Sequence, residues 1–194
     1  MRSLVDQILV AVIDPKKAAE RIMNLRLNDV TVVQATMFIA ICSTIFTYIF
    51  LQIIVTQTTV KVNGSTVLLN EVLSYVSSIQ PLYFAANQVF QMIVFSVIIT
   101  VGGKIFNGKG KFFEALICIT MVESILILLK VLQLILLPFS SLLAFAVIIP
   151  GVIWSLWAFA SVAAFIHGFK STLLTFCGGF ALSMLFFVSL NLFY

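Results

Sequence analysis

Charged residues are scarce in this 194-residue chain: Asp, Glu, Lys and Arg together make up 9% of it, whereas 62% of its residues are hydrophobic. So few charges cannot coat the surface of a water-soluble globule, which excludes a soluble fold. The mean hydropathy of +1.19 indicates a chain whose solvent is lipid. The formal net charge of +4 is therefore interpreted through the loops at the membrane surface, and it does not indicate nucleic-acid binding.

Residues that ligate metals or act as nucleophiles are also few. The three cysteines, Cys42, Cys118 and Cys177, show no CxxC spacing, and no serine, cysteine or carboxylate pattern surrounds the single histidine, His167. Nothing in this pattern indicates a disulfide framework, a zinc site or a catalytic triad. The segment GGKIFNGKGK superficially resembles a phosphate-binding loop, but it lacks the ending that such a loop requires. We therefore expect no enzyme activity, no cofactor and no metal, and we interpret this segment as a basic turn between two helices.

Long apolar stretches dominate the rest of the chain. Five of them reach the roughly 20 residues that an α-helix needs to cross about 30 Å of hydrocarbon. They lie at 31–57, 82–104, 112–137, 141–167 and 172–194. Continuous apolar runs favour helices over a membrane barrel, whose strands alternate apolar and polar residues. The sequence thus predicts an all-α polytopic bundle, with a cytoplasmic juxtamembrane segment at 1–30 and a five-helix transmembrane domain at 31–194.

Lys and Arg are distributed unevenly between the loops of this bundle. With five spans, all of the eleven except Lys61 and Lys130 fall on one side of the membrane. By the positive-inside rule that side is cytoplasmic. The N-terminus is therefore predicted to be cytoplasmic and Tyr194 extracytoplasmic.

The segment before the first span predicts two short amphipathic helices on the cytoplasmic membrane face. Asp14-Pro15 is typical of an N-cap followed by the first residue of a helix. The second helix has an apolar face made of Ala18, Ile22 and Leu25. Beside it lies a basic patch made of Lys16, Lys17, Arg21 and Arg26. Such a helix is attracted to anionic lipid. A charged face that only solubilises the segment is an equal alternative.

The loop at 58–81 contains the turn dipeptide Asn63-Gly64 between TTVKV and STVLL. This pattern predicts a small extracytoplasmic β-hairpin, with a plain polar loop as the alternative.

Three segments, in order, resemble the Yip family of small five-span membrane proteins, and its bacterial branch most closely. They are DPKKAAERIMNLRL, GGKIFNGKGKFFEAL and IHGFKSTL. The resemblance implies five helices, a cytoplasmic N-terminus, no enzyme activity and, for the bacterial branch, the cytoplasmic (inner) membrane. Eukaryotic members associate with Rab-type small GTPases through a D-L-x-G-P element. The corresponding stretch here reads LRLNDV, so Rab binding is not expected.

Polar residues inside the predicted spans form a candidate site. Glu123 lies about 11 residues, or roughly 16 Å, into the third span and so near the bilayer midplane. Sequence distance from the turn at 107–110 places Gln91 at the depth of Glu123, and Gln88 at that of Lys130. We therefore predict an intramembrane cluster of these four residues. Glu123 and Lys130 are two turns apart, so an amide such as that of Gln88 is expected to bridge them.

Two functional classes fit these observations. The first is a non-enzymatic membrane organiser, whose basic N-terminal face recruits anionic lipids or a protein partner, or whose bundle forms a homo-oligomer. The alternative is a small transporter or channel with a polar site around Glu123. The sequence shows neither an inverted repeat nor paired broken helices, which favours the organiser. In the organiser the four polar residues hold helices together by hydrogen bonds. In the transporter they form a proton-sensitive pocket.

Overall fold

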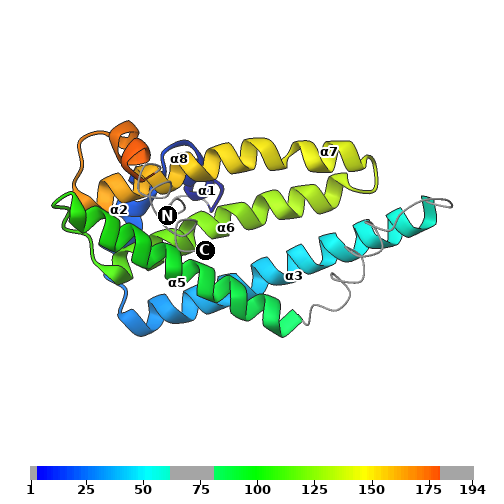
Figure 1. Cartoon of the computed structure of the whole chain (residues 1–194), viewed down its shortest axis with the longest axis horizontal. Helices are drawn as coiled ribbons and strands as arrows, with labels where there is room; N and C mark the ends of the chain where they lie inside the picture. The colour runs from blue at the N-terminus through cyan, green and yellow to red at the C-terminus, as the bar shows by residue number, and fades with distance from the viewer. Residues whose placement is uncertain (1–3, 62–80, 180–194) are drawn as a thin grey trace, which may run out of the picture.

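The structure, a computed structural model, describes residues 4–61 and 81–179 of the chain, and nearly all of these are helical (Figure 1). Four segments are long and apolar enough to cross a membrane: Asp29–Ile54, Pro81–Ile105, Phe112–Leu136 and Leu142–His167. The predicted all-α class is thus confirmed for the described residues, and their four long apolar helices fit a membrane protein. The described residues support four spans. Of the predicted fifth span they include only the helical turns at 172–179, so that span stays a prediction.

The first three spans are single helices whose lengths follow from the apolar runs. They are α3 (Asp29–Lys61), α5 (Pro81–Ile105) and α6 (Phe112–Leu136). The fourth span, predicted at 141–167, is divided into α7 (Ser141–Ala146) and α8 (Ile148–His167). Pro150 explains the break, because it has no N–H and its ring clashes with the carbonyl of the residue four positions earlier. That carbonyl belongs to Ala146, the last residue of α7.

Helix α6 is the centre of the bundle. In its most apolar stretch 61% of the residues are buried inside the protein, whereas the share is 17% in each of the other three spans. It packs against α3, α5 and α8, and Figure 1 shows it running between them. Small side chains line its contact with α8: Ala115, Cys118 and Val122 on α6 meet Ala158 and Val162. Small residues allow close backbone approach, which drives helix association in lipid, where apolar side chains gain little by leaving the solvent.

The N-terminal helices α1 (Leu4–Ile13) and α2 (Pro15–Asn24) pack against this core. Asp14 caps α2 as predicted, since its carboxylate accepts a hydrogen bond of 3.0 Å from the Lys17 N–H. Ala18 and Ala19 are 6% and 0% exposed and join the cluster between α6 and α8. Of the predicted apolar face, Ala18 is therefore covered by protein, Ile22 is half-buried and Leu25 stays exposed, so only part of this face packs against the spans. Alanines allow this packing, because they let α2 approach the two spans closely.

The predicted β-hairpin is not supported. Helix α3 continues through Lys61, so residues 58–61 of the first predicted strand are helical. The rest of the predicted hairpin, at 62–80, lies outside the described residues. Each residue added to an existing helix gains a backbone hydrogen bond, whereas an isolated two-stranded hairpin is only marginally stable in water. The helix therefore extends beyond the apolar run that predicted it.

Candidate functional site: a buried ion pair between α3 and α6

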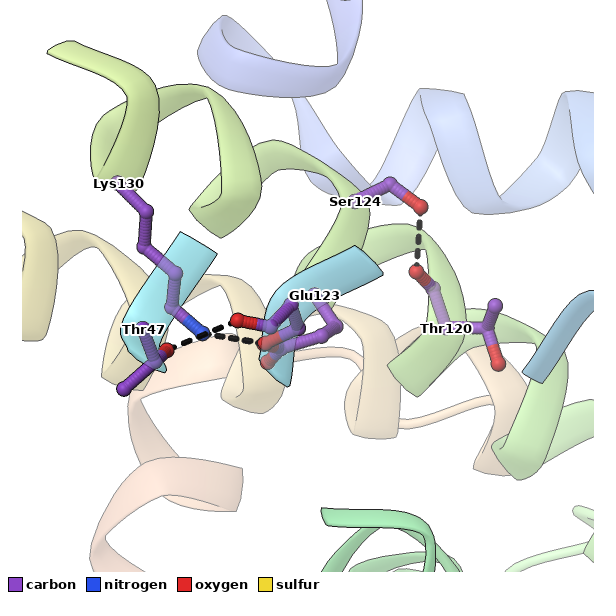
Figure 2. A network of polar contacts seen from close by, with 6 residues as sticks. Thr47, Thr120, Glu123, Ser124 and Lys130 are labelled. Carbon is purple, nitrogen blue, oxygen red and sulfur yellow. Dashed lines mark hydrogen bonds and ion pairs between the residues drawn. The ribbon is translucent and has the colours of Figure 1, made fainter. Parts of the chain in front are cut away.

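Glu123 and Lys130 of α6 form a direct ion pair, with Lys130 Nζ 3.0 Å from Glu123 Oε1 (Figure 2). Their side chains are 11% and 25% exposed, so the pair is largely shielded. The prediction that a bridging amide was needed was wrong. Side chains on a helix lean toward its N-terminus, and lysine has a long flexible stem. Lys130 therefore reaches back over the seven residues that separate it from Glu123.

Ser43 of α3 completes the site from the opposite helix. Its hydroxyl donates a hydrogen bond of 2.6 Å to Glu123 Oε1 and accepts one from Lys130 Nζ. Ser43 is fully buried. Thr47, one turn further along α3, donates to the Ser43 carbonyl oxygen. The carboxylate thus receives both an ammonium and a hydroxyl, the kind of pairing that a buried charge requires.

Further hydroxyls lie along the same interface. Thr36 of α3 and Thr120 of α6 are buried, with their Oγ1 atoms 2.8 Å apart. Ser124 donates to the Thr120 carbonyl oxygen, as Figure 2 shows. Thr44, also buried, differs from these residues, because its hydroxyl has no hydrogen-bond partner within the part of the chain that the structure describes. The contact between α3 and α6 is therefore a polar seam, with the ion pair at one end.

The two glutamines predicted to join the cluster lie apart from it. Gln88 is half-buried on α5 and Gln91 is exposed. Between residues 81 and 179 no hydrogen bond joins either amide to Glu123 or Lys130. The buried residues of α5 are Met92, Ser96, Thr100 and Gly103. Gln91 lies about 100° around the helix from Met92, the nearest residue of this stripe, and so points away from it. Gln88 lies one turn before Met92, on the side of the stripe, but it does not bond to the ion pair.

Ser43 was not among the predicted site residues, although the sequence contains a signal for it. Thr36, Ser43 and Thr47 recur at spacings of seven and four residues, which places their hydroxyls on one helical face. Hydroxyl side chains that share one face of a membrane helix indicate an interhelical contact.

Three residues of the predicted basic patch lie on α2, and Arg26 follows its end. Lys16, Lys17 and Arg26 are exposed, and Arg21 is half-buried. Within the part of the chain that the structure describes, none of the four forms an ion pair. A shallow apolar depression of about 270 Å³ lies between α2, α3 and α6, and Ile22, the neighbour of Arg21, forms part of its wall. The basic side chains are thus free to meet an anion beside an apolar surface.

Comparisons with known proteins give this chain no relative: no family model matches it, and no curated protein or solved structure matches it either. Among the described residues, no group of three or more His, Cys, Asp or Glu could hold a metal ion. What can be concluded about function therefore comes from the geometry of the helices, the ion pair and the basic residues.

Proposed function

We propose that the protein is a non-enzymatic membrane organiser, a helical bundle that presents the basic face of α2 to anionic lipid headgroups of the cytoplasmic leaflet. One observation carries this proposal: α2 buries Ala18 and Ala19 against the spans while Lys16 and Lys17 stay exposed. The spans hold α2 in place, so its basic side chains are already oriented when a lipid arrives, which lowers the entropic cost of binding. Each Lys or Arg near an anionic membrane surface contributes about 1 kcal/mol.

The apolar depression beside α2 supports the same proposal. It is lined by Ile22 of α2, Phe38 and Ile39 of α3, and Met121 of α6. An acyl chain in this depression would place its headgroup near Arg21. A lipid with an anionic headgroup therefore matches both the charge and the apolar surface.

The test uses the full-length protein in nanodiscs that contain about equal amounts of anionic and neutral phospholipid. Native mass spectrometry counts the lipids that stay bound. Replacing Lys16 and Lys17 by Gln should reduce the retained anionic lipid. The matched control replaces Lys104 and Lys109, two other exposed lysines, and removes the same charge. If both double variants retain the same lipids as the native chain, specific recruitment at α2 is refuted.

In this proposal the ion pair of α6, joined to α3 by the Ser43 hydroxyl, stabilises the contact between the two helices and takes no part in transport. Removing one charge leaves the other buried and unpaired, which costs about 3–5 kcal/mol in buried pairs. Glu123→Gln and Lys130→Met should therefore each destabilise the bundle, whereas the double variant should be more stable than either one. Lipid retention by the double variant should equal that of the native chain. A folded Glu123→Gln protein that has lost all lipid preference would contradict a purely structural role.

A small transporter or channel is the second candidate, and one observation favours it. The Thr44 hydroxyl is buried without a hydrogen-bond partner among the described residues, one position from Ser43. A polar atom of this kind can face a bound water or a passing ion. Proton flux into proteoliposomes, read with a pH-sensitive dye, separates the candidates. Flux that Glu123→Gln abolishes would favour the channel, and no flux above empty liposomes would favour the organiser.

We also propose the topology and family that the sequence predicts: five spans, a cytoplasmic N-terminus, membership of the Yip family and a bacterial inner membrane. Helix α2, the turn after α5 and the end of α8 lie together at one end of the bundle in Figure 1, and this end carries most of the basic residues. A reporter fused after Tyr194 tests the odd number of spans. If a reporter that works only in the cytoplasm is active at this position, an odd number of spans is refuted. Crosslinking in native membranes tests for a protein partner or a second copy of the chain.

A further inference from the structure

The last residue of α8, His167, is enclosed by the turn that joins α5 to α6. The residue is 4% exposed. The Gly110 N–H donates to Nδ1 over 3.1 Å, and Nε2 lies 3.0 Å from the carbonyl oxygen of Ile99. A backbone N–H can only donate and a carbonyl can only accept, so Nδ1 is unprotonated and the proton is on Nε2. These contacts therefore fit one form of the ring, the neutral Nε2–H tautomer.

Three glycines allow the turn to approach the ring this closely. A Cβ on Gly103 would lie 2.1 Å from Nε2, one on Gly108 would lie 2.3 Å from Nδ1, and one on Gly110 would lie 2.7 Å from Cε1. No side chain fits at these distances, so the backbone itself forms the socket. Phe169 stacks on the ring, with centroids 5.5 Å apart and an interplanar angle of 21°. The ring is thus held by backbone and by an aromatic neighbour, with no room to turn.

We propose that His167 is a proton-sensitive latch, which holds the α5–α6 turn on the end of α8 only while its imidazole is neutral. Protonation would place an N–H on Nδ1, directly against the Gly110 N–H. Two donors cannot bond each other, so the charged ring loses one of its two hydrogen bonds and the turn separates from it. Histidine is the side chain whose ordinary pKa lies between pH 5 and 8, so acidification is the signal that would open the latch.

The charged groups around the ring are few and can be tested separately. Lys104, near the end of α5, and Glu114, in the first turn of α6, act on it electrostatically with opposite signs. The Glu114 carboxylate also accepts the Lys111 N–H over 3.0 Å at the start of α6. The turn itself carries Lys109, which is exposed, and Lys170 follows α8. Opening the latch would free a turn with several lysines at the membrane face, a consequence that does not depend on lipid binding by α2.

His167 is the single histidine of the chain, which makes a direct test possible. Full-length protein labelled with ¹⁵N-histidine and ¹⁵N-glycine is placed in nanodiscs and titrated from about pH 8 to about pH 5, where histidine changes charge. At the higher pH the ring signals should report the Nε2–H tautomer. As the ring protonates, the Gly110 amide should shift with the same midpoint, and its hydrogen exchange, corrected for intrinsic rate, should become about tenfold faster, as expected for one lost hydrogen bond.

Three results would overturn the latch: the Nδ1–H tautomer at high pH, a ring that stays neutral to the end of the titration, or a protonated ring with an unchanged Gly110 amide. Two variants exclude other titrating groups. His167→Gln keeps a donor and an acceptor but cannot titrate, so exchange at Gly110 should no longer depend on pH. Glu114→Gln should leave the pH response in place. Should His167→Gln fail to fold, Phe169→Leu, which removes only the stacking, should still show the coupled titration.

Discussion

Replacing Gly103 by Ala gives the sharpest test of how the α5–α6 turn is held. Inside a helix alanine is favoured over glycine by about 1 kcal/mol, so the change should stabilise α5 if nothing opposed it. The added Cβ would lie 2.1 Å from His167 Nε2, far inside ordinary contact distance, and would force the ring out of its socket. We therefore expect the opposite sign: a less stable protein.

The magnitude follows from the contacts that the ring loses. Its two hydrogen bonds are worth about 1 kcal/mol each, and its stacking on Phe169 contributes about 1 kcal/mol more. Subtracting the gain of about 1 kcal/mol in helix propensity leaves a net destabilisation of about 2 kcal/mol. Unfolding in mixed micelles by increasing dodecyl sulfate, followed by tryptophan fluorescence, measures this difference.

Two further proteins show whether the clash is the cause. Gly178→Ala is the matched control, because Gly178 is also helical and its Cβ would meet Phe106 at an ordinary 3.6 Å. It should be neutral or slightly stabilising. The double variant of Gly103→Ala with His167→Ala removes the ring as well. It should therefore lower the free energy of unfolding by no more than His167→Ala alone does. Simple additivity of the two single changes, or a Gly103→Ala protein as stable as the native chain, would refute the reasoning.

Two other substitutions probe the N-terminal docking and the polar seam. Trp154 Nε1 donates to the Val12 carbonyl oxygen over 2.9 Å. Trp154→Phe should therefore lower the free energy of unfolding by about 1 kcal/mol and speed hydrogen exchange in α1. Trp157→Phe, at a half-exposed position, is the control and should show neither effect. Thr44→Val removes a buried hydroxyl that has no partner among the described residues, so it should stabilise the bundle by about 1 kcal/mol in the same micelle assay. Thr36→Val removes a hydroxyl that is hydrogen-bonded, so it should destabilise the bundle. Equal effects of the two threonine substitutions on stability would refute this distinction between a hydrogen-bonded and an unpartnered hydroxyl.

Element lengths were predictable from the sequence because the thickness of the bilayer sets them. The run at 112–137 contains α6, observed as Phe112–Leu136, and the run at 82–104 differs by one residue at each end from α5, observed as Pro81–Ile105. Breaks depend on single residues instead. A hydropathy window averages over Pro150, although this residue divides the fourth span by a local steric effect.

The orientation of each helix around its own axis was not predictable in the same way. In water an apolar stripe marks the face that is buried, but in lipid an apolar side chain is equally stable against lipid and against protein. Depth along the membrane normal could be counted from the turn at 107–110, and it placed Gln91 level with Glu123. Rotation could not be counted, and Gln91 is exposed on α5. For the same reason, nothing in the apolar pattern of α2 distinguished a lipid surface from the α6 and α8 surface that it contacts.

Small and hydroxyl residues carry the information that apolar residues lack here. On α5 the buried residues are Met92, Ser96, Thr100 and Gly103, whereas Phe90, Phe95 and several branched aliphatic residues are exposed. Bulky side chains can face lipid without cost, but a hydroxyl needs a partner and a glycine gains only where another element approaches closely. Ser96 and Thr100 donate to carbonyl oxygens of their own helix, and Gly103 receives the His167 ring. The spacing of residues that lipid cannot satisfy therefore identifies the protein-facing side of a span.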